Sequence, residues 1–378
     1  MNKKILLITN IFPPVIGGPA TFIDRLGYAL VHRGYQVTVI CSSAASWHES
    51  DSARPFRVRR IVSRAQVELI AKALPIMIWE MLWHKKILVN GNELAAWLAS
   101  RLASRKYVLK IVGDTVWETA RNNGSTALDI EEFQHSVVTD NPGIQRTNRW
   151  RRHYLSGART VITPSNFLRR IVEGWGVPAE KIQVIHNGIL TEDYRTFQPR
   201  SRAPGNMQVA FVGRLTNWKG VETLLLAASR LTGIEVYVMG EGPEYPLLVA
   251  LADQLGLSGK VNFTGRLDQA GLKETLSKMD VLVLGSSYEG LSHTLLEAGA
   301  MGLACISSNQ GGNPEVITHE ETGLLYPYGD VQALCNALIA LRDDEKLRYS
   351  LACNAKEAIS RFDFNNTVEQ TVQCILGN

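Results

Sequence analysis

The chain has no closely spaced pair of cysteines and no long apolar run. Its five cysteines, at positions 41, 305, 335, 353 and 374, are scattered, and no C-x-x-C pair occurs. This pattern argues against a disulfide framework and a structural zinc site, and it favours a reducing compartment. The start, MNKKILLITN, is too short in apolar residues for a secretory signal, and Ala73 to Trp83 is too short to span a bilayer. We expect a cytoplasmic protein without a transmembrane segment, and contact with the inner face of the membrane stays open.

Several cofactor and catalytic motifs are also missing. The sequence contains no G-x-G-x-x-G, Walker A, H-E-x-x-H or G-x-S-x-G motif. These absences argue against a nicotinamide enzyme, a P-loop nucleotidase, a zinc protease of that type and an α/β-hydrolase. We expect neither a cofactor nor a metal ion.

Length and charge both indicate two parts. A chain of 378 residues exceeds the usual size of a single hydrophobic core. Residues 1–190 carry 25 Lys and Arg against 14 Asp and Glu, whereas residues 191–378 carry 15 against 22. This asymmetry indicates that the first half meets an anionic partner.

Buried strands alternate with helical patterns along the chain, and the alternation restarts after residue 205. The first half opens with a strand at Lys3 to Thr9, a Pro/Gly loop, a helix from Thr21 that Gly34 stops, and a second strand. The sequence therefore predicts an α/β protein with two Rossmann-like domains facing a deep cleft. We expect the first domain to comprise residues 1–188 and 362–378, and the second to comprise residues 189–361. A last helix is expected at residues 361–376.

The segment GSSYEGLSHTLLEAGAMG, residues 285–302, follows a buried strand, so it lies at the edge of the sheet where α/β domains bind ligands. Ser292 is a plausible N-cap, which would leave the backbone N–H groups of His293, Thr294 and Leu295 for an anion. The carboxylates of Glu289 and Glu297 suit the hydroxyls of a sugar or a ribose. A capped surface helix with solvated glutamates is the alternative.

The segment FVGRLTNWKGVETLL, residues 211–225, places Arg214 and Lys219 on either side of a short loop after a strand. A planar guanidinium and a compact ammonium suit a diphosphate, although a basic loop is more often only solvated. In the first domain, Gly17 and Gly18 allow the backbone to approach a ligand closely, but glycines are also common in turns.

These segments together resemble the retaining glycosyltransferases of family 4, which have the GT-B fold. The resemblance rests on Glu289-x7-Glu297 in EGLSHTLLEA, on VGRLTNWKG, on GEGPE (240–244), on VNFTGRL (261–267) and on GGNPEVITHEETGLLY (311–326). It extends from the GGPATFIDRLGYAL segment (17–30) to about residue 326. Each piece alone is weak, and the combination is specific.

The resemblance implies roles for individual residues. Arg214 and Lys219 would neutralise the donor diphosphate, Glu289 would bind the transferred sugar, and Glu297 would bind the ribose. The backbone of His293 to Leu295 would cap the distal phosphate, and the backbone of Gly265, Arg266 and Leu267 would contact the base. Gly18 would approach the phosphates from the first domain, beside Gly17. The donor-binding set implied in full is Gly17, Gly18, Arg214, Lys219, Gly265, Arg266, Leu267, Glu289, Gly290, Leu291, Ser292, His293, Thr294, Leu295 and Glu297. The donor would be a UDP-, GDP- or ADP-sugar bound without metal, and the last helix would return to the first domain.

One position departs from the family pattern. Where members often carry a histidine near the reacting sugar, this sequence has Gly113-Asp114 in YVLKIVGDTVWE. Asp114 is expected either to contact the donor sugar or the acceptor, or to serve as an N-cap or loop residue. No protein nucleophile is evident, so retention would depend on the geometry of donor and acceptor.

Two basic and aromatic segments suggest an anionic membrane surface as a further partner. They are Ala65 to Lys86, with Trp79 and Trp83, and the cluster of Arg146, Arg149, Arg151 and Arg152 around Trp150. The alternative is that the tryptophans are core and the arginines a solvated face. No nucleic-acid recognition module accompanies the charge, so nucleic acid is not expected.

Three classes of function remain at this stage. The first is a retaining glycosyltransferase acting on a glycan or lipid-linked acceptor in glycoconjugate, oligosaccharide or polysaccharide synthesis. The second is another GT-B enzyme, such as a phosphorylase or an epimerase. The third is a non-catalytic nucleotide-sugar binder, which donor hydrolysis or transfer would exclude.

Overall fold

The computed structural model describes residues 3–15, 17–63, 65–136, 142–201 and 203–377. The chain divides into two compact units. Unit 1 comprises the residues up to Pro164, Leu168–Ile185 and the chain from Thr367; unit 2 comprises Ser165–Phe167 and His186–Asn366.

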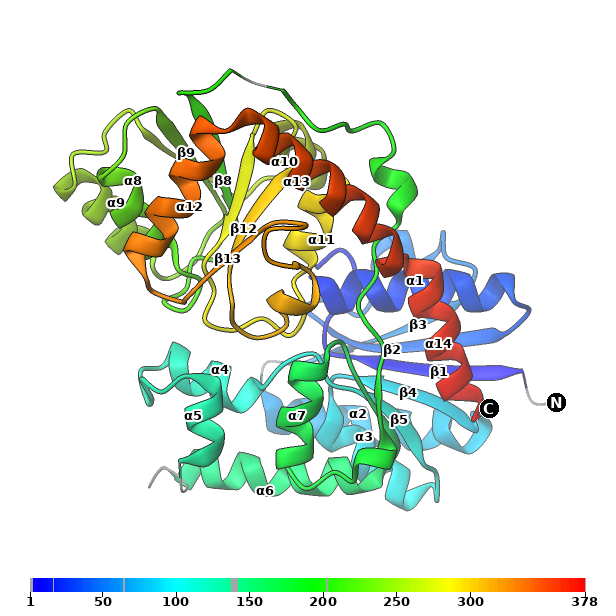
Figure 1. The fold of residues 1–378 in the computed structure, drawn as a ribbon. Coiled ribbons are helices and arrows are strands. Elements are labelled where there is room, and N and C mark those ends of the chain that lie inside the picture. Colours follow the sequence, from blue (N-terminus) through cyan, green and yellow to red (C-terminus); the bar gives the residue numbers. More distant parts are fainter. Residues whose placement is uncertain (1–2, 16, 64, 137–141, 202, 378) are drawn as a thin grey trace. The chain divides into compact units, whose positions relative to one another are not determined.

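Unit 1 is a parallel sheet in the order β3-β2-β1-β4-β5-β6-β7. Figure 1 shows α1 and α14 on one face of this sheet, and α2 and α3 on the other. The buried strands are runs of apolar residues, as expected for a sheet that helices cover on both faces. Its strands are β1 (Lys4–Thr9), β2 (Gln36–Ser43), β3 (Arg57–Val62), β4 (Lys86–Asn90), β5 (Tyr107–Lys110), β6 (Ala158–Thr163) and β7 (Ile182–Val184). Its helices are α1 (Gly18–His32), α2 (Gln66–Trp83), α3 (Glu93–Leu102), α4 (Thr115–Asn122), α5 (Ile130–His135), α6 (Pro142–Gly157) and α7 (Asn166–Gly174), whose first residues belong to unit 2.

Helix α1 shows how local sequence sets these elements. Phe22, Ile23, Leu26 and Leu30 are buried at helical spacing. Gly34 has a φ of 79°, and its N–H donates to the carbonyl of Val31 at 2.8 Å, so the helix ends where the sequence predicted.

Unit 2 repeats the same architecture with a parallel sheet in the order β10-β9-β8-β11-β12-β13. Its strands are β8 (Met207–Val212), β9 (Ile234–Met239), β10 (Val261–Gly265), β11 (Val281–Leu284), β12 (Ala304–Ser308) and β13 (Leu324–Tyr326). Its helices are α8 (Val221–Ser229), α9 (Tyr245–Gln254), α10 (Gln269–Leu276), α11 (His293–Ala300), α12 (Val331–Asp343) and α13 (Glu345–Ala358). The prediction of two successive α/β sheets is confirmed.

Two strands have no counterpart in the sequence prediction, and both lie at sheet edges. Strand β3 carries Arg57, Arg59 and Arg60 among six residues, and β13 has three residues only. An edge strand is partly exposed and tolerates charge, so its sequence lacks a continuous apolar signal.

The last helix begins later than expected. Residues Ile359–Phe362 form a short 3-10 turn, and α14 runs from Phe364 to Leu376. The Asp363 carboxylate accepts the backbone N–H of Asn365 at 2.8 Å in the first turn of this helix. From Thr367 onwards the helix belongs to unit 1. Within the described residues, no helix combines the length and the hydropathy needed to cross a bilayer.

Candidate functional site

Apart from Gly17 and Gly18, the predicted donor-binding segments lie at the carboxyl ends of the parallel strands of unit 2. They follow the carboxyl ends of β8, β10 and β11, and the glycine-rich segments 240–244 and 309–313 follow β9 and β12. Because the strands are parallel, these ends meet at the same edge, where open α/β domains bind ligands. The structure thus brings together segments that are about 100 residues apart in the sequence.

Lys219 and Glu289 are in direct contact at this edge. The Lys219 ammonium lies 2.7 Å from Glu289 Oε1, and the hydroxyl of buried Ser286 donates to the same oxygen at 2.7 Å. Both side chains are mostly buried, with 19% and 15% of their surfaces exposed. Within the described residues both hydrogen bonds end on Oε1, so Oε2 keeps its capacity to accept a ligand hydroxyl. Ser286 carries no recognisable sequence signal, because a hydroxyl in a loop has no distinctive spacing.

Glycines allow the loops around this ion pair to pack backbone against backbone. Gly220 has a φ of 75°, and a Cβ there would lie 2.1 Å from the carbonyl oxygen of Gly285. A Cβ on Gly311 would lie 2.6 Å from the carbonyl oxygen of Glu289, and the Gly312 N–H donates to that oxygen at 2.8 Å. The glycines in NWKG and GGNP therefore hold Lys219 and Glu289 at their observed positions.

The first turn of α11 adds backbone donors beside Glu289. Ser292 is its N-cap, as predicted, and the Ser292 hydroxyl accepts the N–H of Leu295 at 3.2 Å. Because the Leu295 N–H is bonded to the Ser292 hydroxyl, the backbone donors expected to bind an anion are reduced to those of His293 and Thr294. Both residues are half-buried. Glu297 lies one turn further along and is half-buried too.

The remaining predicted donor residues of unit 2 line the same edge. Arg214 is exposed just beyond β8, and Arg266 is exposed just beyond β10. Gly265 has a φ of 69°, and its carbonyl accepts the N–H of Gly240 at 2.9 Å, which ties the ends of β9 and β10 together. Gly290 is half-buried, and the carbonyl of buried Leu291 accepts from the Asn187 amide at 3.5 Å. Leu267 is half-buried and packs against the core of unit 2.

In unit 1, Gly17 and Gly18 begin helix α1. Gly17 is the N-cap and makes no side-chain cap, and a Cβ there would lie 2.8 Å from the Ile11 side chain. Residue 16, in the same loop, lies outside the described part of the chain. A sterically restricted glycine at a helix N-terminus is consistent with close approach of a ligand to the backbone.

Asp114 serves as the N-cap of α4, which is one of the two roles that the sequence left open. The residue is only 1% exposed. Its Oδ1 accepts the backbone N–H groups of Val116 and Trp117 at 3.0 and 3.2 Å and lies 3.0 Å from the Arg151 guanidinium. Its Oδ2 accepts the Gln134 amide at 3.0 Å. These bonds occupy most of the accepting capacity of the carboxylate.

The Asp114 contacts close into a ring of side chains. The Arg151 guanidinium stacks on the Trp175 ring at 3.9 Å, and the Trp175 indole N–H donates to the Gln134 amide oxygen at 2.8 Å. The ring ties the start of α4 to α5, α6 and the end of α7. It lies beside a cavity of about 500 Å³, lined by Phe133, Gln134, Ser136, Ile144, Asn148, Arg151, Arg152, Gly174, Trp175 and Gly176.

The position of Arg151 corrects one expectation. The sequence grouped Arg151 with Arg146, Arg149 and Arg152 as a basic cluster for a membrane surface, but Arg151 is buried and paired with Asp114. The other three arginines are exposed, and Trp150 contacts the rings of Trp97 and His153. Helical periodicity explains the difference, because neighbouring residues on a helix point in different directions.

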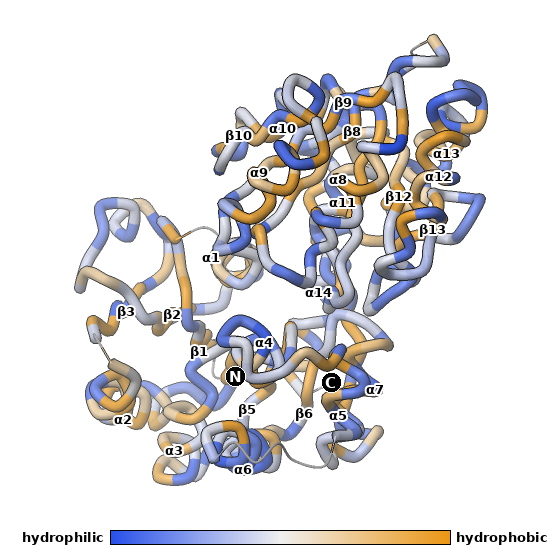
Figure 2. The backbone as a smooth tube through the Cα atoms, turned by 90° about the vertical axis from the view of Figure 1, so that its left-hand side faces the viewer, coloured by the Kyte–Doolittle hydropathy of each residue, from blue (hydrophilic) through white to orange (hydrophobic). Residues whose placement is uncertain are grey.

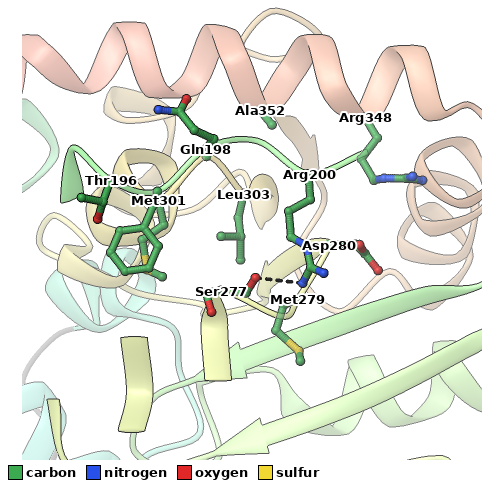
Figure 3. A pocket seen from close by; sticks show the side chains of 12 residues that line it. Thr196, Gln198, Arg200, Ser277, Met279, Asp280, Met301, Leu303, Arg348 and Ala352 are labelled. Atoms are coloured by element: carbon green, nitrogen blue, oxygen red, sulfur yellow. Dashed lines mark hydrogen bonds between the residues drawn. The ribbon is translucent and has the colours of Figure 1, made fainter. Parts of the chain in front are cut away.

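A second cavity, of about 250 Å³, lies in unit 2 but away from the carboxyl ends of its strands. Figure 3 shows Arg200, Ser277 and Asp280 around it, with the hydrogen bond from the Arg200 guanidinium to the Ser277 carbonyl drawn as a dashed line. Met279 and Leu303 precede β11 and β12, so this cavity lies at the amino end of the strands. It is therefore separate from the loops predicted to bind the donor.

Comparison with known proteins gives two family matches that together cover most of the chain. Residues 16–193 match the model described as Glycosyltransferase Family 4, and residues 194–358 match Glycosyl transferases group 1. A glycogen synthase of Mycobacterium tuberculosis is 26% identical over 99% of this chain and 94% of its own length. The lipopolysaccharide core biosynthesis glycosyltransferase LpsE of Rhizobium meliloti is 28% identical, covering 91% of each chain.

Solved structures show the same fold. HepE of Anabaena, in complex with UDP and glucose, superposes with a TM-score of 0.78 at 20% identity, covering 99% of this chain and 100% of its own. Sucrose-phosphate synthase of Thermosynechococcus elongatus gives a TM-score of 0.79 at 22% identity and covers 98% of each chain. With both halves matched in sequence and the whole chain matched in fold, the chain belongs to glycosyltransferase family 4, has the GT-B fold and is a glycosyltransferase.

Proposed function

We propose that this glycosyltransferase transfers a sugar, with retention at the anomeric carbon, from a nucleotide diphosphate-sugar to a glycan or lipid-linked acceptor in glycoconjugate or polysaccharide synthesis in the cytoplasm. The observation that carries the proposal is the contact of Lys219 with Glu289 beside the first turn of α11. A cation for phosphate and a carboxylate for hydroxyls stand side by side, as a diphosphate-sugar requires.

In this proposal, donor binding breaks the ion pair between Lys219 and Glu289. The Lys219 ammonium then binds the diphosphate, with Arg214 as a second cation, and the Glu289 carboxylate binds the sugar hydroxyls. Glu297 binds the ribose, and the backbone at Gly265 to Leu267 contacts the base. Arg214 and Lys219 supply the counter-charge that the departing diphosphate needs, so the proposed reaction requires no metal ion.

The choice of nucleotide is tested by thermal unfolding in the presence of UDP-, GDP- and ADP-sugars. A ligand that binds the native state raises the unfolding temperature by mass action. Relatives are named for different donors: one from Mycobacterium tuberculosis is a GDP-mannose-dependent mannosyltransferase, and HepE was solved with UDP-glucose. We expect one nucleotide class to raise the unfolding temperature more than the others. A chain that responds to none of them contradicts the proposed donor site.

Retention is tested on the product of the reaction. With a preferred donor and an accepted sugar acceptor, the anomeric configuration of the new bond is measured by proton NMR before the product equilibrates. We expect the configuration of the donor to be preserved. A product of opposite configuration rules out retention while leaving donor binding intact.

A second proposal concerns the exposed face of α2, which we infer docks on an anionic lipid surface. Val67, Ala71, Pro75, Trp79 and Trp83 recur at intervals of four and are all exposed, whereas Ala73, Met77 and Met81 are buried. Figure 2 shows hydrophobic residues along this helix. An exposed apolar helix face of this length is typical of interfacial helices.

Charge at the end of α2 favours anionic lipid over another protein as the occupant. Lys85 is exposed just after the helix, and the Arg105 guanidinium donates to the carbonyls of Met81 and Leu82 at 3.1 and 3.3 Å. Trp79 and Trp83 contact each other edge to face at 5.9 Å, a rigid aromatic pair suited to the headgroup region.

The membrane proposal is tested by sedimentation with vesicles of phosphatidylcholine, with or without phosphatidylglycerol. We expect binding to the anionic vesicles at low salt, its loss at high salt, and loss in the double variant Trp79→Ser and Trp83→Ser. The matched control is Trp47→Ser, because Trp47 is 60% exposed elsewhere in unit 1. Equal binding by both variants places the contact elsewhere, and no binding by the native chain rejects it.

A further inference from the structure

The carboxyl edge of the unit 1 sheet carries a row of polar side chains on one face. Thr9 of β1 pairs with Asn90 of β4, and the β4–β5 register of Val89 with Leu109 continues to Asn90 beside Lys110. Residues paired across parallel strands point to the same face of a sheet. The Lys110 ammonium lies 4.4 Å from the Phe22 ring of α1, so this is the face that α1 covers.

Two neighbouring donors in this row have no acceptor in the part of the chain that the structure describes. Lys110 is 2% exposed and Asn90 is 5% exposed. Within the described residues, neither the Lys110 ammonium nor the Asn90 amide nitrogen has a hydrogen-bond partner. Buried polar groups in native proteins are almost always bonded, so two adjacent exceptions of the same kind require an explanation.

Packing alone does not explain the pair. The Thr9 hydroxyl in the same row donates to the Ile11 carbonyl at 3.1 Å, so this third polar side chain has a hydrogen-bond acceptor. The ammonium lies over the Phe22 ring. An aromatic ring attracts a cation, but it does not accept a full hydrogen bond. A buried cation without an anionic partner is costly, and a methionine would fill the same space without that cost.

Within the described residues, no acidic side chain pairs with Lys110. The Cys374 thiol of α14 is the titratable group that acts on the pKa of Lys110 there, and burial raises the pKa of this thiol, so it is neutral at pH 7 and supplies no negative charge. From α1 the facing group is Phe22, and from β4 it is Asn90. None of these groups supplies a counter-charge to the ammonium.

We propose that Lys110 and Asn90 form a subsite that binds an oxyanion, namely the phosphate or carboxylate group of an anionic acceptor. This inference rests on the proposed transfer reaction for the identity of the ligand as acceptor. One charged and one neutral donor side by side match two oxygens of such a group, whereas a neutral sugar hydroxyl does not balance the ammonium. Lys110 acts as a binding residue and takes no part in bond making.

Proton linkage gives the subsite a measurable signature. Burial lowers the pKa of Lys110 to about 8 in the unliganded chain. An oxyanion binds the protonated ammonium, so binding raises this pKa, and affinity falls above pH 8 as the amine loses its proton. For a ligand of constant charge, the affinity is expected to fall about tenfold between pH 7 and pH 9.

The test follows the Cε resonance of Lys110 by NMR in a Lys219→Ala background, which weakens anion binding at the donor site. The resonance is assigned by its disappearance in Lys110→Met. Sulfate and acetate are the probes, because their charge is constant in this range, and methyl glucoside is the neutral comparison. We expect both anions to raise the pKa of Lys110 by about one unit or more, and methyl glucoside to leave it unchanged. Asn90→Ala should reduce the anion-induced pKa shift of Lys110 several-fold. The control Lys106→Met, which removes an exposed lysine just before β5, should leave this shift unchanged.

The proposal is overturned if the anions leave the titration of Lys110 unchanged, or if methyl glucoside shifts it equally. It is also overturned if Lys110→Met binds sulfate with the native affinity and pH dependence. The NMR measurement needs no turnover. Donor turnover by the native chain tests the proposed transfer reaction separately, so the two failures are distinguishable.

Discussion

At the carboxyl edge of unit 2, Lys219 and Glu289 lie 2.7 Å apart and are mostly buried. At the carboxyl edge of unit 1, Lys110 is buried with no hydrogen-bond partner in the described residues, and the buried Asp114 carboxylate is held by four donors. The two units therefore differ in whether the lysine at the carboxyl ends of their strands is paired among the described residues. A paired cation exchanges one anion for another at modest cost, whereas an unpaired buried cation destabilises the chain until an anion arrives.

The largest effect is expected for Glu289→Ala. Loss of the carboxylate that we propose binds the sugar should lower the rate of transfer about 10³-fold, equivalent to roughly 4 kcal/mol. Binding of the nucleotide diphosphate, measured by calorimetry, should stay the same or tighten, because Lys219 loses its competing partner. Glu222→Ala, at an exposed position in α8, is the control. Parallel losses of transfer and nucleotide binding would show that Glu289 supports the loop rather than the sugar.

Asp114→Ala should lower the free energy of unfolding by about 3 kcal/mol, measured by urea denaturation. The change removes the N-cap of α4 and leaves the buried Arg151 charge without its anion. Asp114→Asn keeps an acceptor for the cap and should cost less. If Asp114→Asn instead unfolds like the native chain but fails to transfer sugar, the carboxylate has a catalytic role beyond its structural one.

Lys110→Met should raise the free energy of unfolding by about 2–3 kcal/mol at pH 7. Burial lowers the pKa of Lys110 from its ordinary value of 10.5 to about 8, so the native state binds fewer protons than the unfolded state. The destabilisation is therefore complete below pH 8 and fades as the pH rises to 10.5. Urea denaturation from pH 7 to pH 10 checks this slope. If the gain in the free energy of unfolding is independent of pH, packing and not charge explains why methionine is more stable than lysine at this position.

Lys219→Ala should weaken binding of the nucleoside diphosphate about tenfold, or roughly 1.4 kcal/mol, and leave the nucleoside unaffected. The effect is the smallest of the four because Arg214 remains as a second cation. Calorimetry with both ligands measures it, and Lys260→Ala removes an exposed lysine of the same unit as a control. Weaker binding of the nucleoside as well would place Lys219 near the base or the ribose.

The sequence predicted best the elements that a few adjacent residues encode. The strand before Gly213 and the strand before Gly285 are apolar runs that end at glycine, and both were found from the sequence because buried parallel strands need such runs. Ser292 was recognised as an N-cap for the same reason, since capping is a matter of a few adjacent residues. The edge strands β3 and β13 escaped detection because partial exposure removes the apolar signal.

By itself, the sequence determined two α/β units and the family, because these follow from local periodicity and from motifs of fixed spacing, and it supplied the segments proposed to bind the donor. Only the tertiary structure decided which partners the charged groups have. It paired Lys219 with Glu289 and Asp114 with Arg151, and it placed Lys110 beside Asn90 with no acceptor among the described residues. These outcomes depend on the register of parallel strands and on the direction of each side chain from its helix, which no local pattern encodes.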